Sequence, residues 1–259
     1  MNLPQIGFGT YRLLGDVCVK SVELALKTGY RHLDTAQLYR NEVEVGVGIK
    51  NSSVAREQLF ITTKLNFKVM EAGKEAMLQS VKESLNKLGV SYIDLLLLHA
   101  PLDNYVTNWK DLIAIQSALG KDVIRQIGVS NFGQEHLTQI IPFAVPYANQ
   151  IEVSPFWQRA ELIAFCEKNK IKPIAHSSLI KGELFSDPSL VKLAAELSMS
   201  PSQLLLSWAY TKGLYILPRS ANPDHIVENF TPKVLSETAL EQVKSLDRKY
   251  ATHPKYLFD

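Results

Sequence analysis

The stretch YIDLLLLHAP, residues 92–101, contains four consecutive leucines followed at once by a histidine. The run from Ile93 to Leu98 has no helical period, and such a run is typical of a parallel strand that is buried on both faces. His99 then stands where the strand leaves the core, which is where α/β proteins place their chemistry. The alternative is a core histidine that is hydrogen-bonded to a backbone carbonyl. The other strands decide between the two interpretations.

Short apolar stretches alternate with longer amphipathic ones along the whole chain. Eight of them predict strands, and these read IGFG from Ile6, RHLD from Arg31, LFITTK from Leu59, IDLLLLH from Ile93, IRQIGVS from Ile124, YANQIE from Tyr147, KPIAHSS from Lys172 and LYILPRS from Leu214. Eight strand–helix units at a spacing of roughly 30 residues predict an α/β protein with a (β/α)8 TIM barrel. An open doubly wound sheet gives a similar alternation, but no GxGxxG follows any of these strands.

Helix starts are marked by side chains that can cap them. Asp187, Ser200 and Asn222 each precede a proline, the residue that suits the first helical position. Asn41 and Glu44 have the spacing of a capping box. We therefore expect helices to begin directly after these four capping residues.

The composition is that of an ordinary globular protein. Hydrophobic residues make up 46% of the 259 residues and charged residues 21%, which supplies a full core and argues against disorder. The 28 Lys and Arg balance 26 Asp and Glu, so we expect no nucleic-acid surface. Without a linker, one domain is expected over residues 1–259. A signal peptide or membrane span is not expected either, and a cytoplasmic monomer is the default.

Polar residues follow nearly every predicted strand. They are Asp34, Lys64, His99, Ser130 with Asn131, Asn149 with Gln150, His176, and Arg219 with Ser220. Parallel strands direct these ends to one mouth of a barrel, where barrel enzymes place their active sites.

Tyr39, in the loop after Asp34, can act as a general acid. Its phenol ordinarily has a pKa of about 10, and a nearby Lys64 ammonium is expected to lower that pKa. Asp34 would hold the lysine charged, and His99 could hydrogen-bond a carbonyl oxygen while a hydride reaches the carbon. Taken singly, Asp34 and Lys64 could be only an ion pair, and Tyr39 an ordinary loop aromatic. No second ligand accompanies His99 at metal spacing, so no metal is expected.

The stretch LPRSANPDHIVENF, residues 217–230, places Arg219 and Ser220 before a helix that starts with a proline. Loops after the last barrel strands commonly bind phosphate, because free backbone N–H groups and the helix dipole favour anions. A solvated arginine beside a helix cap is the alternative.

Seven stretches carry a resemblance to a known family: GFGTYRL, GYRHLDTAQLYRNEVEVG, FITTKL, SLNKLGVSYIDLLLLHAP, IGVSNF, NQIEVSP and LPRSANPDHIVEN. They resemble the aldo-keto reductases along nearly the whole chain. The resemblance implies that the catalytic tetrad of this family falls on Asp34, Tyr39, Lys64 and His99. A non-catalytic NADPH-binding redox sensor of the same fold is the main alternative, and a barrel hydrolase that uses Asp34 and His99 is another.

The resemblance also implies an extended NADPH, with NADH possible, that lies across the barrel mouth. Ser130, Asn131 and Gln150 match positions at the nicotinamide carboxamide. Arg219, Ser220 and Asn229 match positions around the adenosine phosphate. Among the residues matched to the cofactor site, this chain departs from the family pattern in three places: His176 replaces a tyrosine, His225 an arginine and Arg219 a lysine.

The expected substrates follow from further departures. Tyr11 stands where Trp or Phe is frequent, Ala100 replaces a tryptophan after the catalytic histidine, and the tail that ends in PKYLFD is short. The resemblance then implies an open pocket for small aldehydes, α-dicarbonyls such as methylglyoxal, and keto sugar acids such as 2,5-diketo-D-gluconate.

Overall fold

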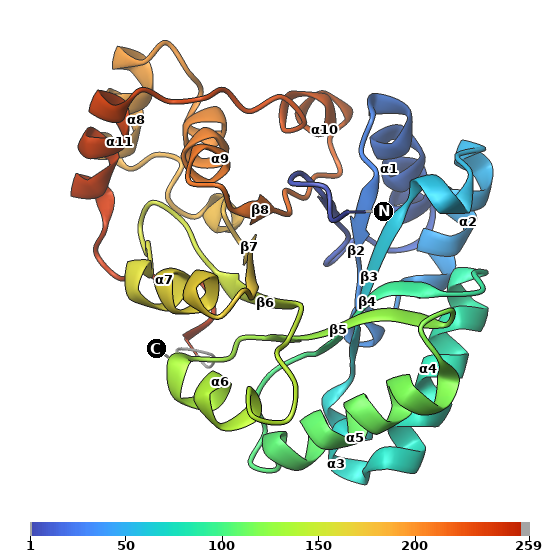
Figure 1. The fold of residues 1–259 in the computed structure, drawn as a ribbon. Helices are drawn as coiled ribbons and strands as arrows, with labels where there is room; N and C mark the ends of the chain where they lie inside the picture. Colours follow the sequence, from blue (N-terminus) through green and yellow to red (C-terminus); the bar gives the residue numbers. More distant parts are fainter. Residues whose placement is uncertain (1, 255–259) are drawn as a thin grey trace.

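The computed structural model describes residues 2–254, so the end of the tail lies outside the described residues. Eight parallel strands follow one another in chain order around one sheet (Figure 1). They are β1 (Phe8–Gly9), β2 (His32–Asp34), β3 (Phe60–Leu65), β4 (Ile93–Leu98), β5 (Ile124–Ser130), β6 (Ala148–Glu152), β7 (Lys172–His176) and β8 (Tyr215–Ile216). A parallel bridge between Ile6 and Ile216 joins the last strand to the first segment. The predicted TIM barrel is confirmed.

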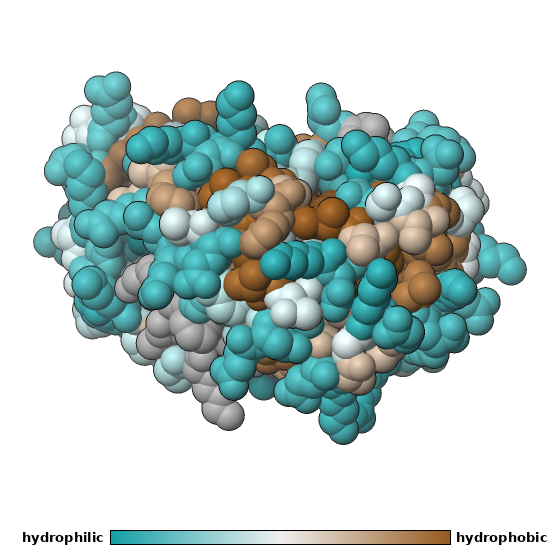
Figure 2. Space-filling model, turned by 60° about the horizontal axis from the view of Figure 1, so that its bottom comes forward, coloured by the Kyte–Doolittle hydropathy of each residue, from teal (hydrophilic) through white to brown (hydrophobic). Residues whose placement is uncertain are grey.

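Helices surround the strands (Figure 1). They are α1 (Gly15–Thr28), α2 (Glu42–Ser52), α3 (Phe67–Ala72), α4 (Lys74–Leu88), α5 (Tyr105–Leu119), α6 (Gln134–Ile140), α7 (Ala160–Lys168), α8 (Pro188–Glu196), α9 (Pro201–Thr211), α10 (Pro223–Glu228) and α11 (Glu237–Val243). Short 3-10 turns add η1 (Gln37–Tyr39), η2 (Arg56–Gln58), η3 (Ile180–Gly182) and η4 (Lys244–Leu246). Within residues 2–254, no helix has the length and apolar character needed to cross a membrane. Figure 2 shows one face of the molecule, on which hydrophilic side chains surround apolar ones that gather near its middle.

The predicted caps divide into three that form and one that does not. Asp187, Ser200 and Asn222 accept hydrogen bonds from the first backbone N–H groups of α8, α9 and α10. Asn41 makes no cap hydrogen bond to α2, so the predicted capping box is wrong. Its side chain instead donates to the carbonyl of Thr10 at 2.8 Å and to a second carbonyl in the same loop. The Oδ1 atom, which a cap would use as its acceptor, instead accepts a hydrogen bond from the Thr35 hydroxyl at 2.9 Å.

The four leucines of β4 are packed on both faces of the sheet, two inside the barrel and two against the surrounding helices. Leu95 and Leu97 belong to the apolar cluster that β3, β6 and β7 share inside the barrel. Leu96 and Leu98 belong to the cluster that packs against α4 and α5. All four are fully buried, and burial of each contributes about 2 kcal/mol. The apolar run therefore serves two cores at once, and its end places His99 at the mouth.

His32 is a fully buried polar residue of β2. Its Nε2 lies 2.9 Å from Thr62 Oγ1, with which it shares a hydrogen bond. A Cβ atom at Gly7 would lie 2.4 Å from the Nδ1 atom of the ring, so this glycine is required for the close approach. Burial and the nearby charge of Lys64 lower the pKa of His32 to about 3. The imidazole is therefore neutral at neutral pH.

Because His32 is buried and neutral, we expect the free energy of unfolding to decrease as the pH falls below 7. In the unfolded chain a histidine has a pKa of about 6.5, so between pH 6.5 and 3 only the unfolded chain binds this proton. The free energy of unfolding then decreases as the pH falls, by about 2 kcal/mol between pH 7 and 5. Urea unfolding at both pH values should show a loss that is smaller by this amount in His32→Gln. Equal losses in the two proteins would contradict the assignment.

Candidate active site

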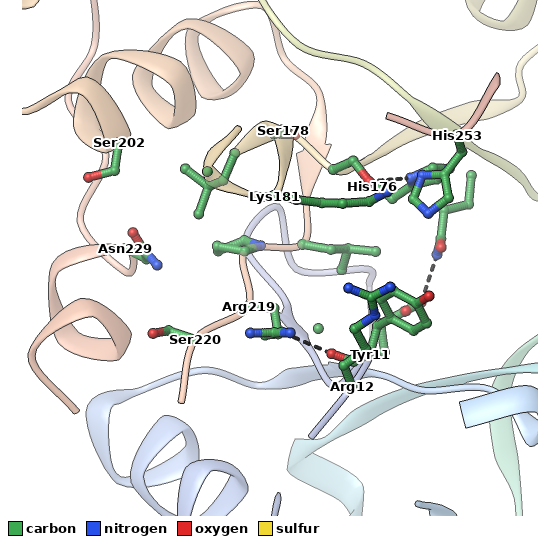
Figure 3. Close-up of a pocket in the computed structure, with 18 of the residues that line it drawn as sticks. Tyr11, Arg12, His176, Ser178, Lys181, Ser202, Arg219, Ser220, Asn229 and His253 are labelled. Carbon is green, nitrogen blue, oxygen red and sulfur yellow. Dashed lines mark hydrogen bonds between the residues drawn. The ribbon is translucent and has the colours of Figure 1, made fainter. Parts of the chain in front are cut away.

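A pocket with a volume of about 720 Å³ opens at the carboxyl ends of the strands. It extends from the end of β2, where Asp34 and Tyr39 lie, to α9 and α10, where Ser202 and Asn229 lie. From one end to the other, Figure 3 labels Ser202, Asn229 and Ser220, then Arg219, Ser178 and Lys181, then Tyr11, Arg12, His176 and His253. The pocket therefore extends between two ends that are lined by different sets of side chains.

Lys64 lies beneath the pocket floor and is almost completely buried. Its Nζ lies 2.6 Å from Asp34 Oδ1 and donates to the Thr35 carbonyl at 2.9 Å and to the Tyr39 hydroxyl at 3.3 Å. Asp34 also accepts a hydrogen bond from Gln150 Nε2 at 2.6 Å. Side chains from three strands thus form a buried hydrogen-bonded group that includes the ion pair and reaches the Tyr39 hydroxyl. Such a pair holds the ammonium in one position and keeps it charged.

The turn that carries Tyr39 is anchored through Gln37. The Gln37 side chain donates to Ser84 Oγ of α4 at 3.0 Å and accepts from the Asn66 backbone N–H at 2.8 Å. Arg40 closes the turn in the left-handed backbone conformation. Because both ends of the Gln37 amide are bound, η1 holds the tyrosine ring at a fixed place on the pocket wall.

The pKa values of this group depend mainly on burial. Burial raises the pKa of Tyr39 well above its usual value, and Asp34 and Tyr11 add to the rise. The predicted lowering of this pKa is therefore wrong. Burial also lowers the pKa of Lys64, while Asp34 opposes that shift. Lys64 already has a carboxylate partner, so its charge does not outweigh the cost of burying a phenolate. In this state the Tyr39 hydroxyl keeps its proton at neutral pH.

His99 lines the pocket and is 8% exposed. Its ring lies 5.8 Å from the Tyr39 ring and 5.1 Å from the Phe67 ring, between centroids. Nδ1 has no hydrogen-bond partner among residues 2–254, so the alternative of a core histidine held by a carbonyl does not describe it. Burial, followed by Lys64 and His176, holds the pKa of His99 well below its usual value. The side chain is a neutral imidazole at the mouth.

The ends of β5, β6 and β7 form a second polar group. Asn131 Nδ2 donates to the His99 carbonyl at 3.0 Å and to Ser130 Oγ at 3.1 Å. These contacts orient Asn131 Oδ1 toward His176 Nε2, 3.0 Å away. Ser130 Oγ in turn donates to the Gln150 carbonyl at 2.9 Å. Burial lowers the pKa of His176 to about 3, so this ring is neutral and donates through Nε2.

The opposite end of the pocket carries the basic loop after β8. Arg219 donates through Nε to the Tyr11 carbonyl at 2.8 Å, as Figure 3 shows. Ser220 Oγ accepts the backbone N–H of Asn222 at 3.0 Å. His225 and Asn229 line the same part of the pocket. The structure thus brings the predicted phosphate residues together on one wall.

Basic side chains along the pocket suit an anionic ligand. Arg12, Lys181 and Arg219 line it, and none of them forms an ion pair with another described residue. Ser178 Oγ is buried there and has no hydrogen-bond partner among residues 2–254. Cations without a carboxylate partner and an unpaired hydroxyl fit a ligand with phosphate groups. The donor set is therefore suited to an extended dinucleotide.

Two predicted site residues do not line the pocket. Lys64 contacts it through Asp34 and Tyr39, and Ala100 is buried, with 1% exposed. Other residues that line it were not predicted. Phe67 and Ser178 follow β3 and β7 closely, so the strand-end argument could have found them, whereas no local pattern marks His253.

A family model described as the aldo/keto reductase family matches residues 5–250. The chain belongs to this family. It is 38% identical to methylglyoxal reductase DkgA of Escherichia coli, over 88% of this chain and 83% of the relative. It is 34% identical to methylglyoxal reductase DkgB of Yersinia pestis, over 96% and 94%. An aldo-keto reductase from a deep-sea metagenome library superposes with a TM-score of 0.90 at 32% identity, over 97% and 94% of the two chains.

Aldo/keto reductases are enzymes that reduce carbonyl groups with a nicotinamide nucleotide, and the chain is assigned to this class of oxidoreductase. Among residues 2–254, no group of three or more His, Cys, Asp or Glu side chains could hold a metal ion. In this aldo/keto reductase, Asp34, Tyr39 and His99 line the pocket, and Lys64 lies next to them as the buried partner of Asp34.

Proposed function

We propose that this chain reduces small aldehydes, α-dicarbonyls such as methylglyoxal, and keto sugar acids such as 2,5-diketo-D-gluconate with NADPH. The observation that carries the proposal is the contact between the Tyr39 hydroxyl and Lys64 Nζ, 3.3 Å apart, where Tyr39 lines a pocket of about 720 Å³. The matches to methylglyoxal reductases support the substrate class.

The chain's own residues supply the proton for this reaction. NADPH, when bound, supplies the hydride, so that a carbonyl compound, NADPH and one proton give an alcohol and NADP⁺. Tyr39 donates its O–H proton to the carbonyl oxygen, because its raised pKa keeps the hydroxyl protonated. Lys64, held charged by Asp34, then stabilises the phenolate until a proton returns from solvent. His99 hydrogen-bonds the carbonyl oxygen and orients it toward Tyr39.

Both ends of the pocket have residues that can hold the nucleotide. Ser130, Asn131 and Gln150 offer amide and hydroxyl groups to the nicotinamide carboxamide, and His176 offers a ring face to the nicotinamide itself. On the other wall, the residues assigned to the adenosine end are Arg219, Ser220, His225 and Asn229. We assign the 2′-phosphate to Arg219, because a guanidinium can bind a phosphate through two parallel hydrogen bonds. This supports NADPH over NADH.

The Arg219→Ala variant tests this assignment of the cofactor. Loss of a charge-assisted hydrogen bond should weaken NADPH binding by about 10- to 100-fold. NADH lacks the 2′-phosphate, so its dissociation constant should change by less than about 3-fold. Titration of the intrinsic protein fluorescence with each nucleotide measures both constants. Equal weakening of NADPH and NADH would place Arg219 elsewhere on the cofactor.

The function itself is tested by following absorbance at 340 nm with purified protein, methylglyoxal and either NADPH or NADH. We expect steady oxidation of NADPH and slower oxidation of NADH. Tight binding of NADPH without turnover of methylglyoxal, an aldose or a simple aldehyde would instead support the redox sensor. Product formation without any nucleotide would support a hydrolase.

A further inference from the structure

The end of the described chain is docked on one buried carboxylate. Glu152 is the last residue of β6 and is 3% exposed. Its Oε1 accepts the backbone N–H of Thr252 at 2.6 Å and the Thr252 hydroxyl at 2.7 Å, and its Oε2 accepts the backbone N–H of His253 at 3.1 Å. Within residues 2–254, all hydrogen-bond partners of this carboxylate belong to the tail. Lys181 of η3 holds the same segment by donating to the Thr252 carbonyl at 2.7 Å.

This attachment is stable at neutral pH. Burial alone would raise the pKa of Glu152, but the hydrogen bonds from His253 and Thr252 and the nearby His176 ring lower that pKa to about 2. The carboxylate is therefore ionised at neutral pH, and a charged acceptor strengthens each of the hydrogen bonds it receives. The tail is thus fixed against β6 by contacts between residues about one hundred positions apart.

The attachment brings His253 into the pocket on the substrate side. The His253 ring lies 5.8 Å from the His176 ring and 6.4 Å from the Tyr11 ring, and Tyr11 lies 5.0 Å from Tyr39. Tyr39 is in turn next to His99. His253 is therefore one of a group of neighbouring rings beside Tyr39 and His99, where the reacting carbonyl is assigned. Figure 3 shows it beside His176, at the end of the pocket away from Ser202 and Asn229.

The hydrogen bonds of the tail decide which nitrogen of His253 carries hydrogen. The Thr252 hydroxyl gives its only hydrogen to Glu152, so at 3.1 Å from His253 Nδ1 its oxygen must accept. Nδ1 therefore carries a hydrogen, and it also lies 3.4 Å from Glu152 Oε2. Nε2, on the far side of the ring, has no hydrogen-bond partner among the described residues. In the neutral ring this atom accepts a hydrogen bond and cannot donate one.

We propose that His253, positioned by Glu152, selects carbonyl substrates that carry a hydroxyl group close to the reacting carbonyl, by accepting a hydrogen bond from that hydroxyl at Nε2. A hydroxyl suits this atom in both protonation states of the ring, because it donates to a neutral imidazole and accepts from a charged one. A second carbonyl oxygen can only accept. The preferred class is therefore hydroxyaldehydes and sugar-like ketones, and this inference rests on the proposed reductase function.

The experiment compares two aldehydes of the same length, glyceraldehyde and propanal, which differ in their hydroxyl groups. In His253→Asn, the amide replaces the atoms near Nδ1 and can keep the contact with Thr252, but nothing remains at Nε2. We expect the ratio of kcat/KM for glyceraldehyde to that for propanal to fall by about 3- to 10-fold. The loss should be mainly a higher KM for glyceraldehyde, with a smaller change in kcat/KM for propanal.

His253→Gln is the matched control, because its longer side chain can place an amide oxygen near the position of Nε2. We expect it to keep at least half of the wild-type ratio. Glu152→Gln should lower the ratio as His253→Asn does, although the histidine is intact. The N–H groups of Thr252 and His253 bind different carboxylate oxygens, and an amide has only one acceptor oxygen. Its circular dichroism and its propanal kinetics report whether it is folded, and if it is not, the two His253 variants carry the test.

The outcomes separate this inference from the function on which it rests. A wild-type ratio in His253→Asn, or equal losses for both aldehydes, would overturn the role of His253 while leaving the reductase intact. Failure of the wild-type protein to oxidise NADPH with either aldehyde would overturn the proposed function itself. A low ratio in Asn together with a retained ratio in Gln would support Nε2 as the atom that recognises the hydroxyl.

Discussion

Replacement of Tyr39 by phenylalanine is expected to lower kcat/KM for methylglyoxal by about 10²- to 10⁴-fold, the usual contribution of a general acid. The variant removes only the hydroxyl that lies 3.3 Å from Lys64 Nζ. The ring can keep its packing against Tyr11 and His99, so the pocket should retain its shape. Steady-state rates of NADPH oxidation measure the loss, and fluorescence titration should show an NADPH dissociation constant within about 2-fold of wild type.

Tyr215→Phe is the control for this variant. Tyr215 is a half-buried tyrosine of β8 that does not line the pocket, so its hydroxyl should be dispensable for turnover. If Tyr39→Phe retains more than a tenth of the wild-type activity, the proton comes from another group, and His99 is the first to examine. If wild type binds NADPH tightly and reduces no carbonyl, the tetrad has no catalytic use and the redox sensor becomes the better account.

The barrel could be predicted from sequence because burial on both faces leaves a local record. In β4 the leucines at alternating positions serve two different cores, so the whole run is apolar and reads as a parallel strand. The ends of strands were less predictable. β8 ends at Ile216, before the proline of LPRS, although the Pro218 carbonyl still accepts the backbone N–H of Gly9 at 3.0 Å.

The pocket residues could be predicted only where they follow a strand. Asp34, His99 and Asn131 do so, and parallel strands bring them together without any knowledge of side-chain packing. Glu152 and His253 meet through contacts between β6 and the tail, for which the sequence has no local pattern. The roles of these residues in catalysis and binding stay predictions until the variants are measured.

The pKa of Tyr39 shows a different limit of sequence reasoning. The sequence places a cation near the phenol, and this alone predicts a lower pKa. It does not show that Lys64 is paired with Asp34, nor that the whole group is buried. Burial disfavours the phenolate more than the paired lysine favours it, so the direction of the shift reverses. Electrostatic predictions require the partners and the solvent exposure of every charge involved.

Replacement of Asp34 by asparagine is expected to lower the free energy of unfolding by about 3–5 kcal/mol, the cost of leaving one member of a buried ion pair without its partner. Lys64 Nζ and Asp34 Oδ1 lie 2.6 Å apart, with side chains 1% and 4% exposed. Urea unfolding at neutral pH measures the loss. As a control, Glu83→Gln removes an exposed partner of Lys87, at 3.9 Å, and should change stability by less than about 0.5 kcal/mol.

A double-mutant cycle then separates stability from chemistry. Lys64→Met removes the buried ammonium, so the Asp34→Asn, Lys64→Met double variant has neither charge left unpaired. It should be more stable than Asp34→Asn alone and remain inactive toward methylglyoxal. If the loss of stability in the double variant equals the sum of the losses in the two single variants, the two charges do not depend on each other. Recovery of stability without recovery of activity would support a role of this pair in proton transfer at Tyr39, since uncharged side chains can replace it structurally but the methionine cannot donate a hydrogen bond to the Tyr39 hydroxyl.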